Sequence, residues 1–326
     1  MGLVDEISPG LLPLVCLAGT LLPFADAAGD LLKRFCGVRV SASTVLRDTE
    51  GQGERLRAQQ KEGRMVQPTP AEPRWTASRS AGQPAAYVGL DAFSVPMQGP
   101  GAGPAEHRML YTALLYTPKK EHTRYLVDFA LDALAEQVRA QARAVGLTQV
   151  SALIAVTDGG SGREEALQRH LAEDLTTILD WYHAAEHLCD FAKLWYAQDE
   201  DARGHWQQQA KSLLYEQGGE ALLTHLHALV LPPRASAEVR EALRQLIGYF
   251  ENNRHRTDYP TYRQKGWDIG SGPTEAGCKI IGERLKGSGM RWVEEGAATV
   301  AALRALYVSG GKLWDGFWSQ PRRRAG

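Results

Sequence analysis

The chain has few cysteines, and no two of them form a closely spaced pair. Four cysteines occur in 326 residues, at Cys16, Cys36, Cys189 and Cys278. Zinc ribbons require paired thiolates, and small disulfide-stabilised domains require dense cysteine, so the pattern argues against both classes. Scattered cysteines suit the reducing cytosol.

Long apolar runs are also scarce. The only candidate for a membrane segment is LLPLVCLAGTLLPF at residues 11–24, which contains two prolines. It is shorter than the roughly 20 residues that cross a bilayer as a helix. Asp5 and Glu6 precede it, where a secretory signal would carry positive charge. We therefore expect a buried helix in a cytoplasmic protein without a membrane partner.

Net charge is nearly absent, at -1 for the whole chain, but the charge is unevenly distributed. Residues 232–326 hold 16 Lys and Arg against 10 Asp and Glu, a net charge of +6. The preceding residues hold 21 against 28, a net charge of -7. The basic C-terminal third favours an anionic partner such as DNA phosphates, and a solvated basic face is the alternative.

The N-terminal region predicts helices only. Within residues 1–60, a short apolar helix is followed by Gly37, a serine-rich cap and a second helix from about Ser43. This is the pattern of a helix-turn-helix, whose second helix would lie in a DNA major groove. An ordinary helical hairpin is the alternative. Residues 61–85 contain four prolines and predict a linker.

An α/β domain is predicted after the linker. Strands are expected at 86–97, 107–118, 151–157 and 175–179, and helices at 130–146 and near 163–172. The segment EHTRYLVDF, residues 121–129, is either a third strand or the lead into a helix. The β-β-β-α-β-α-β order matches a ribonuclease H-like mixed sheet with helices on both faces. The predicted core comprises 86–181 and 268–314, with an all-α insertion at 182–267 and a basic tail at 315–326.

Three acidic residues lie where a metal-dependent site needs them. Asp91 interrupts the strand-like run YVGLDAFSV, Asp158 closes the run SALIAVTDGG, and Glu275 lies in the first turn of a predicted helix. Three converging carboxylates repel one another unless cations neutralise them, and hard oxygen ligands favour Mg²⁺ or Mn²⁺. Taken singly, Asp158 could be a turn residue and Glu275 a first-turn helix acid. Asp91 is costly in an apolar strand without a partner.

Four stretches together carry a resemblance to a known family. They are LDAFSVP around Asp91, VTDGG at Asp158, LDWYHAAEHL around Asp180, and GSGPTEAGCKIIGERLKGSGMRW around Glu275. The chain resembles the DDE transposases of Kra-type bacterial insertion sequences, which are related to the Mutator-like group. The resemblance covers roughly residues 8–314, and the last stretch is its most specific part.

The resemblance implies an enzyme that nicks transposon ends and then joins the freed 3′-hydroxyl to target DNA. It implies Asp91, Asp158 and Glu275 as catalytic ligands of two Mg²⁺ or Mn²⁺ ions. Double-stranded DNA, both the terminal repeats and the target, would be the partner of a homo-oligomer associated with the bacterial nucleoid. A non-catalytic DNA-binding protein descended from a transposase is the rival hypothesis.

Asp180 and His183 are expected to support the site. The resemblance implies this role for the Asp-x-x-His pair, and an alternative makes Asp180 the second metal ligand in place of Asp158. A purely structural His183 also stays open. His183, Glu186 and His187 fit H-x-x-E-H, a zinc-peptidase pattern, but the motif is short and lacks a third ligand.

Basic residues alternate with aromatic residues at 251–267, and further basic residues follow Glu275. Cations would meet phosphates, and rings would stack on unpaired bases. Core packing with scattered surface charge is the alternative. The predicted DNA-binding residues are Arg254, Arg256, Tyr259, Tyr262, Arg263, Lys265, Lys279, Lys286, Arg291 and Trp292.

Overall fold

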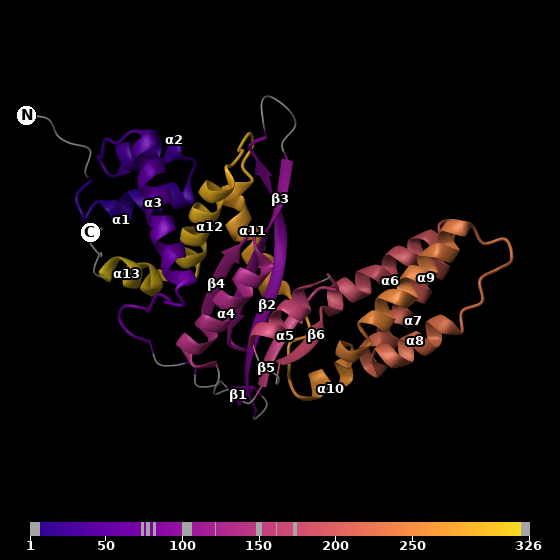
Figure 1. Ribbon diagram of the computed structural model, residues 1–326. Helices are drawn as coiled ribbons and strands as arrows, with labels where there is room; N and C mark the ends of the chain where they lie inside the picture. The colour runs from indigo at the N-terminus through magenta and orange to yellow at the C-terminus, as the bar shows by residue number, and fades with distance from the viewer. Residues whose placement is uncertain are drawn as a thin grey trace, which may run out of the picture.

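A mixed sheet forms the centre of the molecule, with strands in the order β4-β3-β2-β5-β6 (Figure 1). The computed structural model describes residues 7–72, 75, 79–80, 83–99, 106–120, 122–147, 152–160, 162–171 and 175–320. β2 pairs antiparallel with β3 and parallel with β5, so it is the central strand. The strands are β1 (Arg79–Ser80), β2 (Gln83–Met97), β3 (Glu106–Tyr116), β4 (Thr123–Asp128), β5 (Ala152–Thr157) and β6 (Leu175–Leu179).

Helices cover both faces of the sheet, as its apolar strands require. On one face, Val88 and Leu90 of β2 share a core with Leu134 and Val138. The opposite face divides into two cores, one under the helices that follow β6 and one under the last helices of the chain. The helices between the strands are α4 (Leu131–Val145) and α5 (Arg163–Leu171).

The N-terminal helices pack against the last helices of the chain. The apolar run 11–24 forms a helix whose side chains are largely buried, as expected. The second predicted helix begins after Ser41, whose hydroxyl accepts the Thr44 N–H and caps it. One face of this helix is buried against α12, and the DNA-reading role stays a prediction. The helices are α1 (Leu12–Leu21), α2 (Phe24–Asp26), η1 (Ala27–Phe35) and α3 (Ala42–Lys61).

A helical lobe, residues 181–264, projects from the end of β6 (Figure 1). Its apolar core is continuous with one face of the sheet, where Tyr87 and Tyr116 stack at 5.0 Å. Within the predicted all-α insertion, two consecutive helices are separated by Gly218. The lobe contains α6 (Trp181–Trp195), α7 (Glu200–Gln217), α8 (Gly219–His227), α9 (Ala237–Asn252), η3 (Arg254–Arg256) and α10 (Tyr259–Gln264).

After the lobe the chain returns to the sheet. Its first helix contacts β2 and β3, and the next contacts β4 and α3. None of the described helices is both long enough and apolar enough to cross a membrane. The returning helices are α11 (Gly272–Leu285), α12 (Glu294–Val308) and α13 (Gly311–Ser319).

The strands follow the predicted order, and the ambiguous segment at 121–129 is resolved as β4. The proline-rich stretch 61–85 differs from a free linker, because Met65, Val66 and Trp75 are buried. Its backbone is also bonded to the core, since the Trp75 N–H donates to the Val145 carbonyl at 2.9 Å. Between the strands predicted at 86–97 and 107–118, residues 100–105 lie outside the described residues.

Close contact between β2 and α11 depends on Gly89. A Cβ at this position would overlap the Thr274 hydroxyl on the helix that carries Glu275. Gly89→Ala is therefore expected to lower the free energy of unfolding by about 1–3 kcal/mol, the usual cost of overpacking. Gly248→Ala is the matched control, because a Cβ there meets no atom within 4 Å. Urea unfolding of both variants checks the prediction, and equal stabilities would contradict it.

Candidate metal-binding active site

Asp91 lies within β2 and Asp158 directly follows β5, the neighbouring strand. β2 and β5 are parallel, with Leu90 opposite Thr157, so the two aspartates are the next residues on each strand. The Ala92 N–H donates to Oδ1 of Asp91 at 2.7 Å, and the Gly160 N–H donates to Oδ1 of Asp158 at 3.1 Å. The two strands thus place both carboxylates beside the carboxyl end of β5.

Arg163 lies between these two carboxylates. Its Nη1 donates to Oδ1 of Asp158, and its Nη2 is 3.9 Å from Oδ1 of Asp91. Burial alone lowers the pKa of the guanidinium, but the hydrogen bond and charge of Asp158, together with the charge of Asp91, raise it overall. Arg163 is therefore a permanent positive charge in the site.

Asp180 is fully buried at the start of α6, beside the end of β5. Its N–H donates to the Thr157 carbonyl at 2.8 Å, and its Oδ1 accepts the N–H groups of Tyr182 and His183. Burial raises the pKa of this carboxyl, but hydrogen bonds from His183 and Ser271 outweigh burial and lower the pKa to about 2. Asp180 is thus an ionised helix cap under the site.

Ser271 joins Asp180 to Glu275. Its N–H donates to Oδ2 of Asp180 at 2.5 Å, and its hydroxyl donates to Oε1 of Glu275 at 2.8 Å. Pro273 in the first turn of α11 suits a helix start, where its missing N–H costs no hydrogen bond. Two carboxylates that are far apart in the sequence are therefore held together by one serine.

His183 completes a compact group. Its Nδ1 lies 3.7 Å from Oδ1 of Asp180, and that contact raises the pKa of the imidazole to about 9, although burial opposes the shift. The charges of Asp158 and Glu275 raise it further. Before any cation binds, the imidazole is protonated at neutral pH.

Two sets of side chains could hold divalent ions. Among the described residues, Asp180, His183 and Glu275 are the only three His, Cys, Asp or Glu whose ligand atoms all lie within 4.8 Å of one another. Asp91 and Asp158 form a separate pair around Arg163. Carboxylate oxygens predominate in both sets and there is no thiolate, so the residues fit Mg²⁺ or Mn²⁺.

The predicted triad is distributed over these two sets. Asp91 and Asp158 lie in one, and Glu275 lies in the other with Asp180 and His183. The charge of Asp91 also acts on a residue of α11. Burial is the main cause that raises the pKa of the Cys278 thiol, and the charge of Asp91 raises it further. Cys278 lies one helical turn beyond Glu275. The two sets are linked through the backbone, since the Asp180 N–H donates to the carbonyl of Thr157, next to Asp158, and their ligand roles stay predictions.

The H-x-x-E-H pair has no third ligand in the part of the chain that the structure describes. His187 stacks instead on Tyr249 of α9, with ring centroids 4.0 Å apart. Burial lowers the pKa of this imidazole. The geometry supports a packing role for His187 and gives no support to a zinc peptidase.

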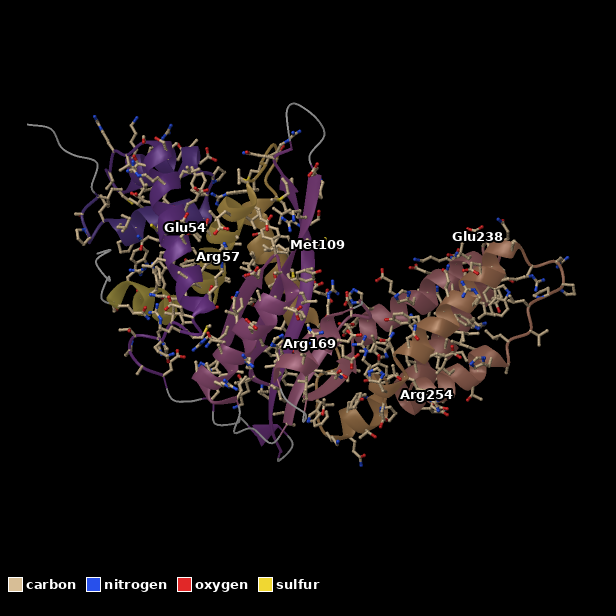
Figure 2. All side chains as sticks on the ribbon, viewed as in Figure 1. Glu54, Arg57, Met109, Arg169, Glu238 and Arg254 are labelled. Atoms are coloured by element: carbon tan, nitrogen blue, oxygen red, sulfur yellow. The ribbon has the colours of Figure 1, made fainter. Side chains whose placement is uncertain are left out.

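Six of the predicted DNA-binding side chains are exposed. Arg254 lies on the outside of the lobe, where Glu220 pairs with it (Figure 2). Arg263 stacks on Tyr215 at 3.7 Å, and Lys265 lies 4.5 Å from the centre of the Trp267 ring. The other three are on or just after the helix of Glu275: Lys279, Lys286 and Arg291.

The remaining four are buried, so they are not on the surface that the prediction required. Arg256 is 3% exposed, and its guanidinium donates to the Thr157 hydroxyl at 2.9 Å and to the Asp158 carbonyl at 3.3 Å. The Tyr259 hydroxyl donates to the Leu179 carbonyl, and Tyr262 and Trp292 are core residues. These side chains attach the lobe and α12 to the sheet.

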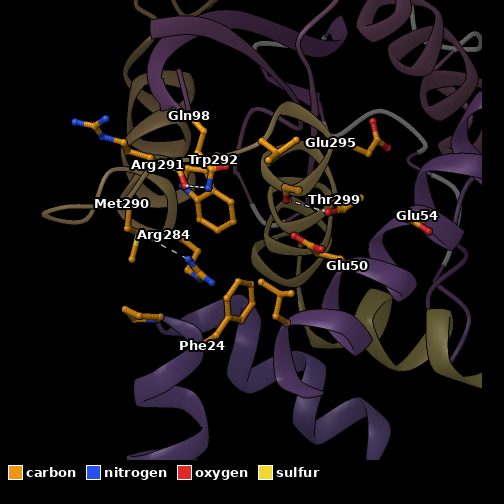
Figure 3. A pocket seen from close by; sticks show the side chains of 14 residues that line it. Phe24, Glu50, Glu54, Gln98, Arg284, Met290, Arg291, Trp292, Glu295 and Thr299 are labelled. Atoms are coloured by element: carbon orange, nitrogen blue, oxygen red, sulfur yellow. Dashed lines mark hydrogen bonds between the residues drawn. The ribbon is translucent and has the colours of Figure 1, made fainter. Parts of the chain in front are cut away.

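A cleft of about 550 Å³ lies between α3 and the start of α12, and its lining does not include Asp91, Asp158 or Glu275 (Figure 3). Arg284 lines this cleft. Its guanidinium carbon lies 4.7 Å from the centre of the Phe24 ring and 5.1 Å from the centre of the Trp292 ring. Burial lowers the pKa of Arg284 to about 10. The indole N–H of Trp292 donates to the Leu285 carbonyl, so this ring is anchored rather than free to stack on a base.

Sequence reasoning missed Arg163 and Ser271. The spacing Ser-x-x-x-Glu at the start of the α11 motif was a usable signal for Ser271, because residues four apart share a helix face. Arg163 carried no such signal. It follows a glycine-rich segment, and only the fold brings it over Asp91.

Comparison with protein-family models gives no match, and comparison with curated protein sequences gives none either. Among solved structures, the chain is similar to a Drosophila P element transposase strand transfer complex. The identity is 10% and the TM-score is 0.30, with 92% of this chain and 79% of that chain covered. A similarity of this size assigns no family, and the chemistry rests on the residues themselves.

Proposed function

We propose that this protein is a DDE-type DNA transposase that cleaves and joins the ends of its own element. The observation that carries the proposal is the return of α11 to the sheet, where Ser271 bonds to both Asp180 and Glu275. Asp180 is in turn bonded through its N–H to the carbonyl of Thr157, next to Asp158, which supports a shared site for these acids. The strand order of the mixed sheet supports a ribonuclease H-like core.

In the proposed reaction the protein mainly positions charge. Two bound divalent ions would activate a water for attack on the scissile phosphodiester and stabilise the departing oxygen. Asp91 and Asp158 would hold one side of the site, and Glu275, with Asp180 and His183, the other. The Ser271 hydroxyl keeps Glu275 oriented, while the sheet keeps Asp91 fixed. Such positioning dominates the catalysis of phosphoryl transfer.

The DNA would approach over the exposed cations near Glu275. Lys279 lies one turn beyond Glu275 on α11 and is exposed, and Lys286 follows at the end of the same helix. Both would contact phosphates, and affinity would therefore fall as salt rises. The exposed Arg263 and Lys265 extend the surface onto the lobe.

The test uses the purified full chain and labelled duplexes that carry the terminal repeats of the element. We expect single-strand nicks that expose a 3′-hydroxyl in Mg²⁺ or Mn²⁺, and none after chelation. Joining of that 3′-hydroxyl to a target duplex should follow in the same metal. A protein that shifts the repeat duplex but nicks it in neither metal would favour the non-catalytic DNA-binding rival.

A further inference from the structure

One guanidinium holds two carboxylates from different parts of the fold. Arg163, at the first position of α5, donates to Asp158 and lies 3.9 Å from Asp91. Its side chain is 13% exposed, against 26% for Asp91 and 23% for Asp158. The three groups are therefore shielded from solvent but still reachable from the surface.

Gly160 leaves room for this arrangement. A Cβ at this position would lie 2.8 Å from Nη1 of Arg163 and 3.0 Å from Oδ1 of Asp158. The contact is also more than closure of the loop between β5 and α5, because Arg163 reaches Asp91 on a different strand. The glycine and the arginine together bring a positive charge to the aspartate pair.

That charge has a consequence for metal binding. An arginine in a protein stays protonated, so it cannot release the carboxylates by losing a proton. A divalent ion that bridged Asp91 and Asp158 would occupy the space where the guanidinium now lies between the two carboxylates. The guanidinium of Arg163 and a divalent ion beside it would also repel each other. Occupation by a metal therefore requires Arg163 to move.

We propose that Arg163 is an exchangeable counter-ion of Asp91 and Asp158, which gives way to a divalent ion and then binds the scissile phosphate. Only the contact with the scissile phosphate rests on the proposed function. The planar fork of arginine matches two phosphate oxygens, and a short movement from the aspartates would keep it at the reacting centre. Arg163 would thus be a positioning residue before metal binding and a substrate contact afterwards.

Isothermal titration of the full chain with Mn²⁺, without DNA, tests the first half. Arg163→Gln is expected to bind Mn²⁺ about tenfold more tightly than wild type, because a charged hydrogen bond no longer competes. The Mn²⁺ affinity of Arg163→Lys should lie between those of wild type and Arg163→Gln, since lysine keeps the charge and lacks the planar guanidinium. Arg169→Gln is the control on the same helix; its arginine is exposed and pairs with Asp132 (Figure 2).

Nicking of the end duplex tests the second half. Arg163→Gln should nick roughly a hundredfold more slowly than wild type despite its tighter metal binding. Arg163→Lys should remain at least about tenfold slower, because a point charge cannot replace the fork. Arg169→Gln should nick like wild type.

These opposite directions separate the proposal from a structural role. Loss of a merely structural ion pair would lower the melting temperature and leave Mn²⁺ affinity equal or weaker, and that result would overturn the proposal. Arg163→Lys that nicks as fast as wild type would overturn the phosphate contact. If wild type binds Mn²⁺ but never nicks, the proposed function fails, while the Mn²⁺ comparison still decides the counter-ion role.

Discussion

Glu275→Gln is expected to slow nicking of the end duplex roughly a thousandfold, the scale of loss when one electrostatic contributor to a transition state is removed. The amide keeps the size of the side chain, and its oxygen still accepts the Ser271 hydroxyl that Oε1 accepts now. What it loses is the negative charge that would hold a cation beside Asp180 and His183. Initial nicking rates in Mg²⁺ measure the effect.

Glu283→Gln is the matched control for that experiment. It lies on the same helix and is exposed, and it removes the same charge away from the carboxylates. Both variants should melt within a few degrees of wild type. Equal nicking rates for the two variants would show that Glu275 takes no part in the reaction. The proposed chemistry would then lack Glu275 as a metal ligand.

Asp180→Asn is expected to lower the free energy of unfolding by about 2 kcal/mol at neutral pH. The fully buried carboxylate accepts three backbone N–H groups, from Tyr182, His183 and Ser271. Asparagine offers one oxygen, and its amide N–H₂ would face one of these donors. Urea unfolding at neutral pH measures the difference.

The pH dependence of this difference follows from the carboxyl itself. Its pKa is about 2 in the folded chain, below the model-peptide value of 3.8, so its stabilisation is present above about pH 4. It is lost as pH falls from there towards 2, because the protonated carboxyl resembles the amide. The gap between wild type and Asp180→Asn should therefore shrink in acid.

Asp190→Asn serves as the control, since this aspartate is exposed on the same helix and pairs with the exposed Lys193. It should change stability little at any pH. A gap for Asp180→Asn that stays constant between pH 7 and pH 3 would contradict the assignment of an ionised, buried cap.

The strands could be predicted because each carries its own signal. Apolar runs of strand length are closed by Asp158 or by Asp180, and the one ambiguous segment was settled by pairing with β3. The acids were singled out for the same reason, since a carboxylate such as Asp91 inside an apolar strand is conspicuous, and their ligand roles stay predictions. Local patterns of this kind need no knowledge of which segments meet.

The remaining features depend on contacts between distant segments. Arg256, Tyr259 and Tyr262 look like a DNA-facing strip in sequence, yet they are buried because the lobe folds back onto β5 and β6. Arg163 gave no local hint of its partner on β2. Alternation of basic and aromatic residues does not distinguish an exposed surface from a buried interface between two parts of the chain.

The lobe leaves and rejoins the sheet at almost the same point. Trp181 N–H donates to the Ile269 carbonyl at 2.9 Å, directly beside the bond from Ser271 to Asp180. Chains tolerate inserted modules whose two ends lie close together. The lobe can therefore be exchanged, by evolution or by engineering, for another that keeps its apolar base on the sheet. The outer surface of the lobe could then change without moving a carboxylate.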